Sequence, residues 1–136
     1  MATVSDYKGR EYVFSEDTSH LEIEYDFSKD AGAVGVLDMV KVKEAMVLES
    51  AYIKVKTACT SGGSATVIVG VNGGDTDAIL DATSGAVANL TAGAVLPGET
   101  ASVALKLDAD AVIGMTIGTA ALTAGKFVLV LKLAQF

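Results

Sequence analysis

The feature that most constrains the fold of this chain is a two-residue alternation of apolar and polar side chains, which recurs in short runs along its length. In the run "HLEIEYDF" at residues 20–27, Leu21, Ile23 and Tyr25 alternate with acidic residues. Successive side chains of a β-strand point to opposite faces, so this period is typical of a strand with one buried face. The run therefore predicts a strand whose outer face is acidic.

Comparable runs follow, and clusters of turn-forming residues separate them. The runs are "VKVK" (40–43), "YIKVK" (52–56), "TVIVGV" (66–71), "VALKL" (103–107), "VIGMTI" (112–117) and "KFVLVLKL" (126–133). The turn clusters lie at 61–64, 72–75, 96–99, 107–110 and 122–126. About seven to nine short strands at this spacing, without long helical patterns between them, predict an all-β fold, namely an antiparallel, jelly-roll-like β-sandwich.

One stretch, residues 81–98, lacks the alternation. Thr83 or Ser84 fits the N-cap of a short helix over "GAVANL", and Gly93 fits the residue that ends it. We therefore expect one short helical segment near 83–91, lying over an open end of the sandwich.

The length of 136 residues, 51% of them hydrophobic, suits one domain with one core. We assign residues 20–136 to a single β-sandwich domain. Residues 1–19 mix aromatic with charged side chains and are a candidate N-terminal arm that orders on a partner; the alternative is a frayed terminus with one edge strand. The residues expected at a partner interface are Tyr7, Lys8, Arg10, Tyr12, Phe14 and Phe136.

A net charge of −7 argues against nucleic acid and against anionic lipid as direct partners, because both attract basic surfaces. The first residues contain no apolar signal segment, and the uncharged stretches are too short or too polar for a membrane helix. A single cysteine allows no internal disulfide. We expect a soluble protein that is made inside a cell and does not bind membranes.

The pair Gly125–Lys126 does not fit a phosphate-binding loop. Such a loop places four residues between its first glycine and the Gly-Lys pair, and Ser or Thr follows the lysine. Here six residues separate Gly118 from Gly125, and Phe127 follows the lysine. We interpret the segment as a hairpin turn in which Gly125 takes a positive φ and Lys126 starts the returning strand.

No other residues form a pattern that carries chemistry. His20 and Cys59 are the only residues of their types, so neither has the partners of a metal or nucleophile site. Asp75, Asp77 and Asp81 lie close together, but they fit ordinary turns better than a calcium loop. The sequence predicts no metal and no cofactor.

The acidic row Glu22, Glu24 and Asp26 resembles a set of glycosidase carboxylates only in composition. Such an acid pair needs a cleft, and these three acids share one exposed face in a chain without tryptophan. Lysines on neighbouring strands are expected to pair with them across the sheet, the candidates being Lys41, Lys43, Lys54 and Lys56. We expect no catalytic residue and no enzyme activity.

Some strands are apolar on both faces. Val128 and Val130 lie opposite the apolar face of the last run, and Ile68 lies opposite the valines of its own strand. Large exposed apolar patches are uncommon on monomers and mark interfaces. We therefore expect a third surface to cover these residues, either a neighbouring subunit or the 81–98 segment.

Residues 46–134 resemble the capsid decoration (cement) proteins and other head-associated structural proteins of tailed bacteriophages. The resemblance rests on "AYIKVKTACTSGGSATVIVGVNGGDTDAILDATSGAVANLTAGAV" and "MTIGTAALTAGKFVLVLKL", in which Val/Thr/Gly-rich strands alternate with "GG" turns. It implies a virion structural protein, made in the host cytoplasm, that oligomerises on the capsid exterior and bridges capsid subunits. The implied partners are the major capsid protein and sister copies.

A second function stays open on the same fold. A β-sandwich of this kind also serves as a carbohydrate- or receptor-binding module of a phage or bacterial surface structure. The candidate contacts for such a ligand are the acids at 75–81 and Tyr52.

Overall fold

The computed structural model of the chain describes residues 3–6, 11–13 and 18–136, with side chains from His20 onward. Within these ranges the chain forms ten β-strands, one short α-helix and two 3-10 helices. In chain order they are β1 (Thr3–Asp6), β2 (Glu11–Val13), β3 (Thr18–Asp26), α1 (Phe27–Asp30), β4 (Gly35–Val42), β5 (Met46–Ser61), β6 (Thr66–Val71), η1 (Val87–Asn89), β7 (Val95–Pro97), η2 (Thr100–Ser102), β8 (Leu105–Leu107), β9 (Val112–Gly118) and β10 (Leu122–Gln135).

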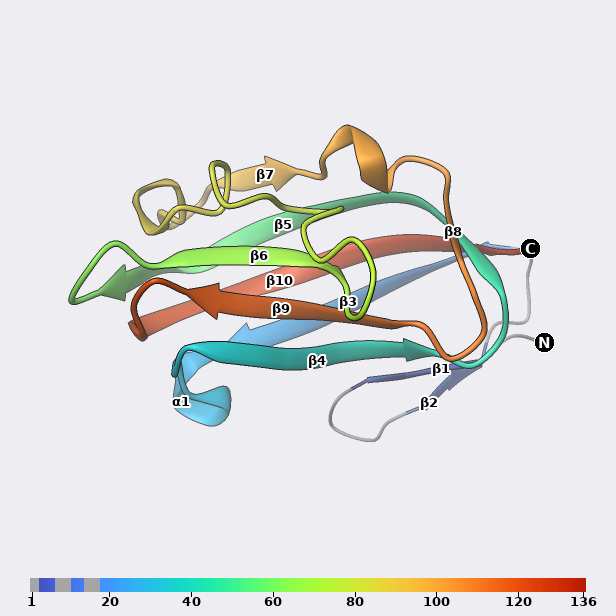
Figure 1. Cartoon of the computed structure of the whole chain (residues 1–136), viewed down its shortest axis with the longest axis horizontal. Helices are drawn as coiled ribbons and strands as arrows, with labels where there is room; N and C mark the ends of the chain where they lie inside the picture. The colour runs from blue at the N-terminus through green and yellow to red at the C-terminus, as the bar shows by residue number, and fades with distance from the viewer. Residues whose placement is uncertain (1–2, 7–10, 14–17) are drawn as a thin grey trace.

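The strands form two antiparallel sheets that pack face to face (Figure 1). Sheet A has the order β2-β1-β4-β9-β6 and lies toward the viewer in Figure 1. Sheet B has the order β3-β10-β5-β7, and β8 also pairs with β5. The chain changes sheet repeatedly, as in a jelly roll: the changes fall between β2 and β3, β3 and β4, β4 and β5, β5 and β6, β6 and β7, β8 and β9, and β9 and β10. The predicted all-β sandwich is confirmed.

The core lies between the two sheets and consists of the apolar halves of the alternating runs. In β10, Phe127, Leu129, Leu131 and Leu133 are all completely buried. The facing strands of sheet A contribute the buried Val67, Val69, Ile113 and Met115. Burial of apolar area on this scale is the dominant favourable contribution to folding.

The predicted hairpin turn at Gly125 is wrong. Strand β10 continues from Leu122 to Gln135, and the turn after β9 lies at residues 119–121, where Thr119 has φ 68°. Gly125 sits in a β-bulge with φ 140°, and a Cβ there would collide with the sulfur of Cys59 on β5. The glycine is therefore needed for close approach of two strands.

The long connection from β6 to β9 closes one flank of the sandwich. It first follows the edge of β6, where Val67 N–H donates to Gly85 and Val69 N–H donates to Leu80. It then follows β5, where Cys59 N–H donates to Leu90 at 2.9 Å. The connection thereby pairs with the outer edge of β6 and with the end of β5, which protects both from pairing with other chains.

The expected helical segment lies in this connection as η1, but it is only one 3-10 turn long. Its N-cap is Ala86, which makes no side-chain capping bond, so the predicted capping by Thr83 or Ser84 is wrong. The segment lies along the flank between β6 and β5, and the buried Leu80 and Leu90 on either side of it belong to the core.

The described parts of residues 1–19 include a hairpin at the edge of sheet A. Strand β1 pairs with β2 on one side and with β4 on the other. Of the expected interface residues, Tyr12 lies in β2, and Tyr7, Lys8, Arg10 and Phe14 lie outside the described residues. The role of this region as an arm on a partner stays a prediction.

Candidate interaction surface

The outer face of sheet B carries charges of both signs, and they neutralise one another. Lys54 Nζ on β5 donates to Glu22 Oε1 on β3 at 2.6 Å, and Lys126 on β10 lies 3.6 Å from Asp26. Lys132 lies 3.8 Å from Glu49. The predicted pairing of the acidic row with Lys54 is confirmed. The pair holds the pKa of Glu22 below its ordinary value, chiefly through the hydrogen bond from Lys54.

Two valines lie beneath these charges. Val128 faces Glu24 and Lys54 on the flanking strands, and Val130 faces Glu22 and Tyr52. The hydrogen bond from Lys54 to Glu22 therefore crosses over β10 between the two valines, whose exposed fractions are only 5% and 1%. Long aliphatic stems of charged side chains commonly shield apolar surface in this way. The expectation that a subunit or the 81–98 segment must cover Val128 and Val130 is wrong.

The outer face of sheet A differs in composition. Val36, Thr116 and Ile68 form one cross-strand row over β4, β9 and β6, and Gly118 and Thr66 form the next row. Beyond Val36, the Asn72 side chain donates to Asp38 at 2.7 Å and lies over Gly114. These two rows carry no charged side chain.

This uncharged face continues into an exposed apolar corner beside α1, which we call the α1 corner and define as residues 30–37. Val34 and Val36 keep 58% and 63% of their surface exposed. They line a hollow of about 210 Å³, together with Leu37 and Ile117 at its floor. Contiguous exposed apolar patches are uncommon on monomers and commonly mark interfaces.

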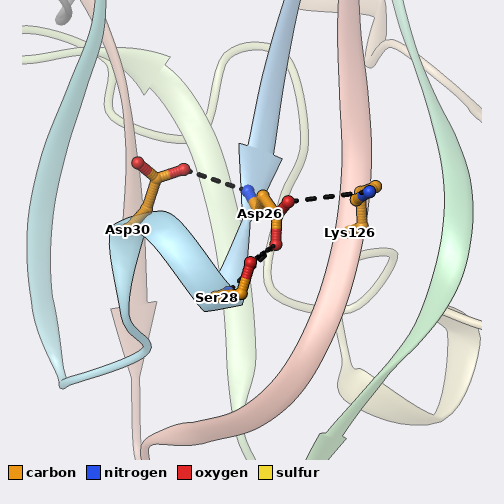
Figure 2. Close-up of polar contacts among 4 residues, drawn as sticks. All are labelled: Asp26, Ser28, Asp30 and Lys126. Atoms are coloured by element: carbon orange, nitrogen blue, oxygen red, sulfur yellow. Dashed lines mark hydrogen bonds and ion pairs between the residues drawn. The ribbon is translucent and has the colours of Figure 1, made fainter.

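Hydrogen bonds of Asp26 fix the position of α1, which adjoins the α1 corner (Figure 2). Asp26 is the N-cap of α1, and its Oδ1 accepts from both the N–H and the hydroxyl of Ser28, at 3.0 and 2.8 Å. Asp30 Oδ2 accepts in return from the Asp26 N–H at 3.0 Å. The bonds from Ser28 hold the pKa of Asp26 below its ordinary value, and Lys126 contributes further.

Tyr25 and Gly32 fix the backbone of the α1 corner on the side that faces the core. The Tyr25 hydroxyl donates to the Ala31 carbonyl at 2.7 Å, and its ring packs 5.1 Å from that of Phe127. Burial raises the pKa of Tyr25 to about 12, so the hydroxyl stays a donor at neutral pH. Gly32 is buried against Leu122, whose N–H donates to the Gly32 carbonyl at 2.8 Å. The two exposed valines are thus presented on a fixed backbone.

Isolated exposed apolar side chains lie elsewhere. Val95 on β7 and Val103 after η2 are single exposed side chains. Phe136, which the sequence assigned to a partner interface, keeps 75% of its surface exposed. Lys106 Nζ lies 4.4 Å from the centre of its ring, at the end of the sandwich opposite α1 (Figure 1).

The residues considered for chemistry are not brought together. His20 lies exposed on the outer face of sheet B, and Cys59 is buried on β5, where burial raises its pKa to about 11. Among the described side chains, no group of three or more His, Cys, Asp or Glu is arranged to hold a metal ion. Asp77 lies beside Asp75, and a hydrogen bond between the two carboxyl groups raises the pKa of Asp77.

A groove of about 400 Å³ lies between η1, β7 and η2. Its lining includes Asn89, Pro97 and Glu99, and it contains no aromatic side chain on which a sugar ring would stack. The acids at 75–81 and Tyr52, named above for a carbohydrate ligand, are not among its lining residues.

The helices of the described chain also lack the length and apolar character that crossing a membrane would require.

No known protein family matches this sequence, and no curated protein matches it at a significant level. Solved structures do match its fold. A chain of the capsid asymmetric unit of cyanophage Pam1 matches with a TM-score of 0.63 and 11% identity, over 92% of this chain and 89% of that one. A chain of the capsid of Ralstonia phage GP4 matches with a TM-score of 0.63 and 17% identity, over 92% and 90%.

A third similar chain comes from the acidic stable capsid structure of Helicobacter pylori bacteriophage KHP30. Its TM-score is 0.57 at 14% identity, and the match covers 98% of this chain and 93% of that one. At such identities the similarity shows the fold alone. The jelly-roll-like fold that the resemblance implied is therefore found in chains of phage capsids, over nearly the full length on both sides.

Proposed function

We propose that this protein is a structural component of a phage virion, which binds the outer surface of the capsid as an oligomer and bridges capsid subunits. The observation that carries the proposal is the near full-length fold match to chains of three phage capsids. Its partners in this role are the major capsid protein and sister copies. The function is mechanical and needs no catalytic group.

The α1 corner and the adjoining rows of sheet A support this role as the docking surface. Val34 and Val36 offer exposed apolar area on a backbone held by Asp26 and Tyr25. A preorganised apolar patch loses little conformational entropy on binding, so more of its burial energy remains for affinity. Repetition of such a contact by symmetry multiplies the stabilisation over a shell.

The residues assigned from sequence form a further contact in the proposal, separate from the α1 corner. Tyr7, Tyr12 and Phe14 act as aromatic anchors, Lys8 and Arg10 make polar contacts, and Phe136 adds an apolar contact. Exposed aromatic residues are frequent in the centres of interfaces, where they bury much area with few rotatable bonds. Phe136 keeps 75% of its surface exposed and so has area to bury in such a contact.

The experiment is binding of the purified protein to capsids of its own phage that lack it, followed by sedimentation and electron cryomicroscopy. We expect co-sedimentation at a fixed stoichiometry and added density on the outer surface. Capsids that carry the protein should also resist heat or chelation better than bare capsids. Absence of the protein from intact virions, together with no binding to bare capsids, would exclude the function.

A matched pair of variants tests the docking surface separately. Val36→Asp places a charge in the α1 corner, and we expect at least about tenfold weaker capsid binding. Val103→Asp is the control, because Val103 and Val36 both have an exposed fraction of 63%. Both variants should fold with wild-type stability. Equal binding by the two would move the docking surface away from the α1 corner without affecting the proposed function.

A further inference from the structure

Asn72 and Gly73 occupy the tight turn that follows β6. The Gly74 N–H donates to the Val71 carbonyl at 3.0 Å, and Gly73 has φ 80°. Gly73 is thus the third residue of a β-turn, where a positive φ favours glycine. It is exposed, and a Cβ built on it would meet nothing within 4 Å. Asn72 therefore precedes a peptide nitrogen that no side chain crowds.

An asparagine that precedes glycine carries the reactants for its own deamidation. The Gly73 nitrogen attacks Cγ of Asn72, the new N–C bond closes a succinimide ring, and the bond from Cγ to the side-chain nitrogen breaks. The proton of the Gly73 N–H leaves with that nitrogen as ammonia. Water then opens the ring at one of its two carbonyls, which gives aspartate or isoaspartate. Ring closure needs backbone freedom, and glycine has more of it than any other residue.

The chain contains one other asparagine, and its surroundings oppose the same reaction. Asn89 precedes Leu90, whose side chain is buried and whose N–H donates to the Val87 carbonyl at 3.1 Å. The Asn89 side-chain amide also donates to two backbone carbonyls, at 3.0 and 3.4 Å. By contrast, the Gly73 N–H has no backbone acceptor among the described residues. The structure therefore favours reaction at Asn72 over reaction at Asn89.

One hydrogen bond controls the position of the Asn72 side chain. Its Nδ2 donates to Asp38 Oδ1 at 2.7 Å across Gly114, and this bond has to open before Cγ can approach the Gly73 nitrogen. The product of the reaction is a carboxylate, which is ionised at neutral pH and can only accept hydrogen bonds. It cannot restore the bond to Asp38, and two like charges at this separation repel each other.

We propose that Asn72 is a deamidation site, at which the chain irreversibly replaces its bond to Asp38 by repulsion between two carboxylates. The reaction loosens the 72–77 loop on sheet A and adds a negative charge next to the two uncharged rows of that sheet. The inference goes beyond the proposed virion role and does not depend on it.

The test is mass spectrometry of peptides from the full chain after incubation in mildly alkaline buffer made with ¹⁸O-enriched water. We expect Asn72 to exchange its NH₂ group for OH, with the new oxygen taken from water, at least about tenfold faster than Asn89. Incubation in urea gives the rate of the unfolded chain for comparison. Equal rates at the two asparagines of the folded chain, or an intact Asn72 over a period in which it reacts in urea, would overturn the proposal.

Two pairs of variants test the role of the bond to Asp38. Asp38→Ala removes the acceptor and should speed deamidation by about fivefold, whereas Asp38→Asn keeps an acceptor and should speed it less. Asn72→Asp reproduces the product and should lower the thermal midpoint by about 4 °C, and Asn72→Ala, which loses the bond without adding charge, should lower it less. Added salt should narrow that difference. An unchanged rate in Asp38→Ala, or equal midpoints for the two variants at position 72, would contradict the proposal.

Discussion

The outer faces of the two sheets differ in how their outward-pointing valines are covered. On sheet B, Val128 and Val130 would be exposed on a bare strand, but Lys54 and Glu22 meet above them and both valines are buried. On sheet A, Val36 occupies a similar outward position, and no ion pair between the described side chains crosses it. The first face is complete within one chain, whereas the second leaves apolar area for another molecule.

The difference shows that apolar residues on both faces of a strand do not by themselves indicate an interface. What decides is whether long polar side chains on the flanking strands reach over the apolar residue. On β10 both flanking strands supply such side chains, namely Glu22 and Lys54. Beside Val36 the cross-strand neighbour is Thr116, which is too short to do so. The α1 corner is therefore the better candidate for docking.

The largest effect is expected at Gly70 on β6, where the 72–77 loop lies against the outer face of sheet A. A Cβ on Gly70 would collide with the backbone of Asp75 and Thr76, so Gly70→Ala should displace the 72–77 loop from the outer face. We expect a loss of about 3 kcal/mol in the free energy of unfolding, measured by denaturant titration. Gly74→Ala is the control, because its Cβ meets only ordinary contact with Val71. A neutral Gly70→Ala would show that the loop does not lie on this face.

The second prediction compares the two faces directly. Val130→Ala removes buried methyl groups and should lower the free energy of unfolding by about 2 kcal/mol. Val36→Ala removes exposed methyl groups and should change it by less than about 0.5 kcal/mol. Denaturant midpoints at constant slope measure both values. Equal losses would mean that Val36 is covered in solution, for example by a second copy, and the comparison between the faces would fail.

The sandwich could be predicted from the sequence because the alternation that marks each strand lies within a few consecutive residues. The alternation in "KFVLVLKL" places Phe127, Leu129, Leu131 and Leu133 on one face, and all four are buried. The burial of Val130 on the opposite face could not be predicted, because it depends on Glu22 and Lys54, which are far apart in sequence. Their meeting over β10 follows only from the strand order β3-β10-β5. Strand order is the information that period-two patterns do not contain.

The α1 corner was missed for a related reason. The segment "AGAVGV" at 31–36 has no alternation and many small residues, so it was not assigned to a strand, although β4 begins at Gly35. One signal was present in "DFSKD": an aspartate just before a short turn is a frequent N-cap, and Asp26 has that role. The position of Val36 on an outer face still required the pairing of β4 with β9.

The third prediction separates the two roles of Lys54 on sheet B. Lys54→Met keeps the aliphatic stem over Val128 and Val130 but removes the charge, and Lys54→Ala removes both. We expect Lys54→Ala to lower the thermal midpoint more than Lys54→Met does, because exposed ion pairs contribute little while the stem shields apolar surface. The opposite order, or strong sensitivity of the wild type to added salt, would show that the charge pair itself matters more than shielding.

The smallest expected effects are those of pH on stability. They again compare the charged outer face of sheet B with the 72–77 loop on sheet A. Glu22 and Asp26 have lowered pKa values in the folded protein, so their stabilisation is present above the ordinary values of 4.5 and 3.8 and is lost as pH falls through the lowered ones. Asp77 has a raised pKa in the folded protein. Its contribution to stability is therefore present below pH 3.8, the ordinary value, and is lost as pH rises through the raised pKa. The ionised Asp77 beside Asp75 therefore slightly destabilises the fold at neutral pH.

Two substitutions resolve these opposing contributions in thermal unfolding measured from about pH 7 down to about pH 3. Asp77→Asn should be slightly more stable than the wild type at pH 7, and the difference should vanish as pH falls below the ordinary value of 3.8, where the carboxyl is protonated in both the folded and the unfolded chain. Glu22→Gln should be slightly less stable at pH 7 and converge with the wild type in acid. A stabilising effect of Glu22→Gln at pH 7 would mean that the bond from Lys54 does not form in solution. The outer face of sheet B would then lose the pair that buries its valines, and both faces would present apolar surface.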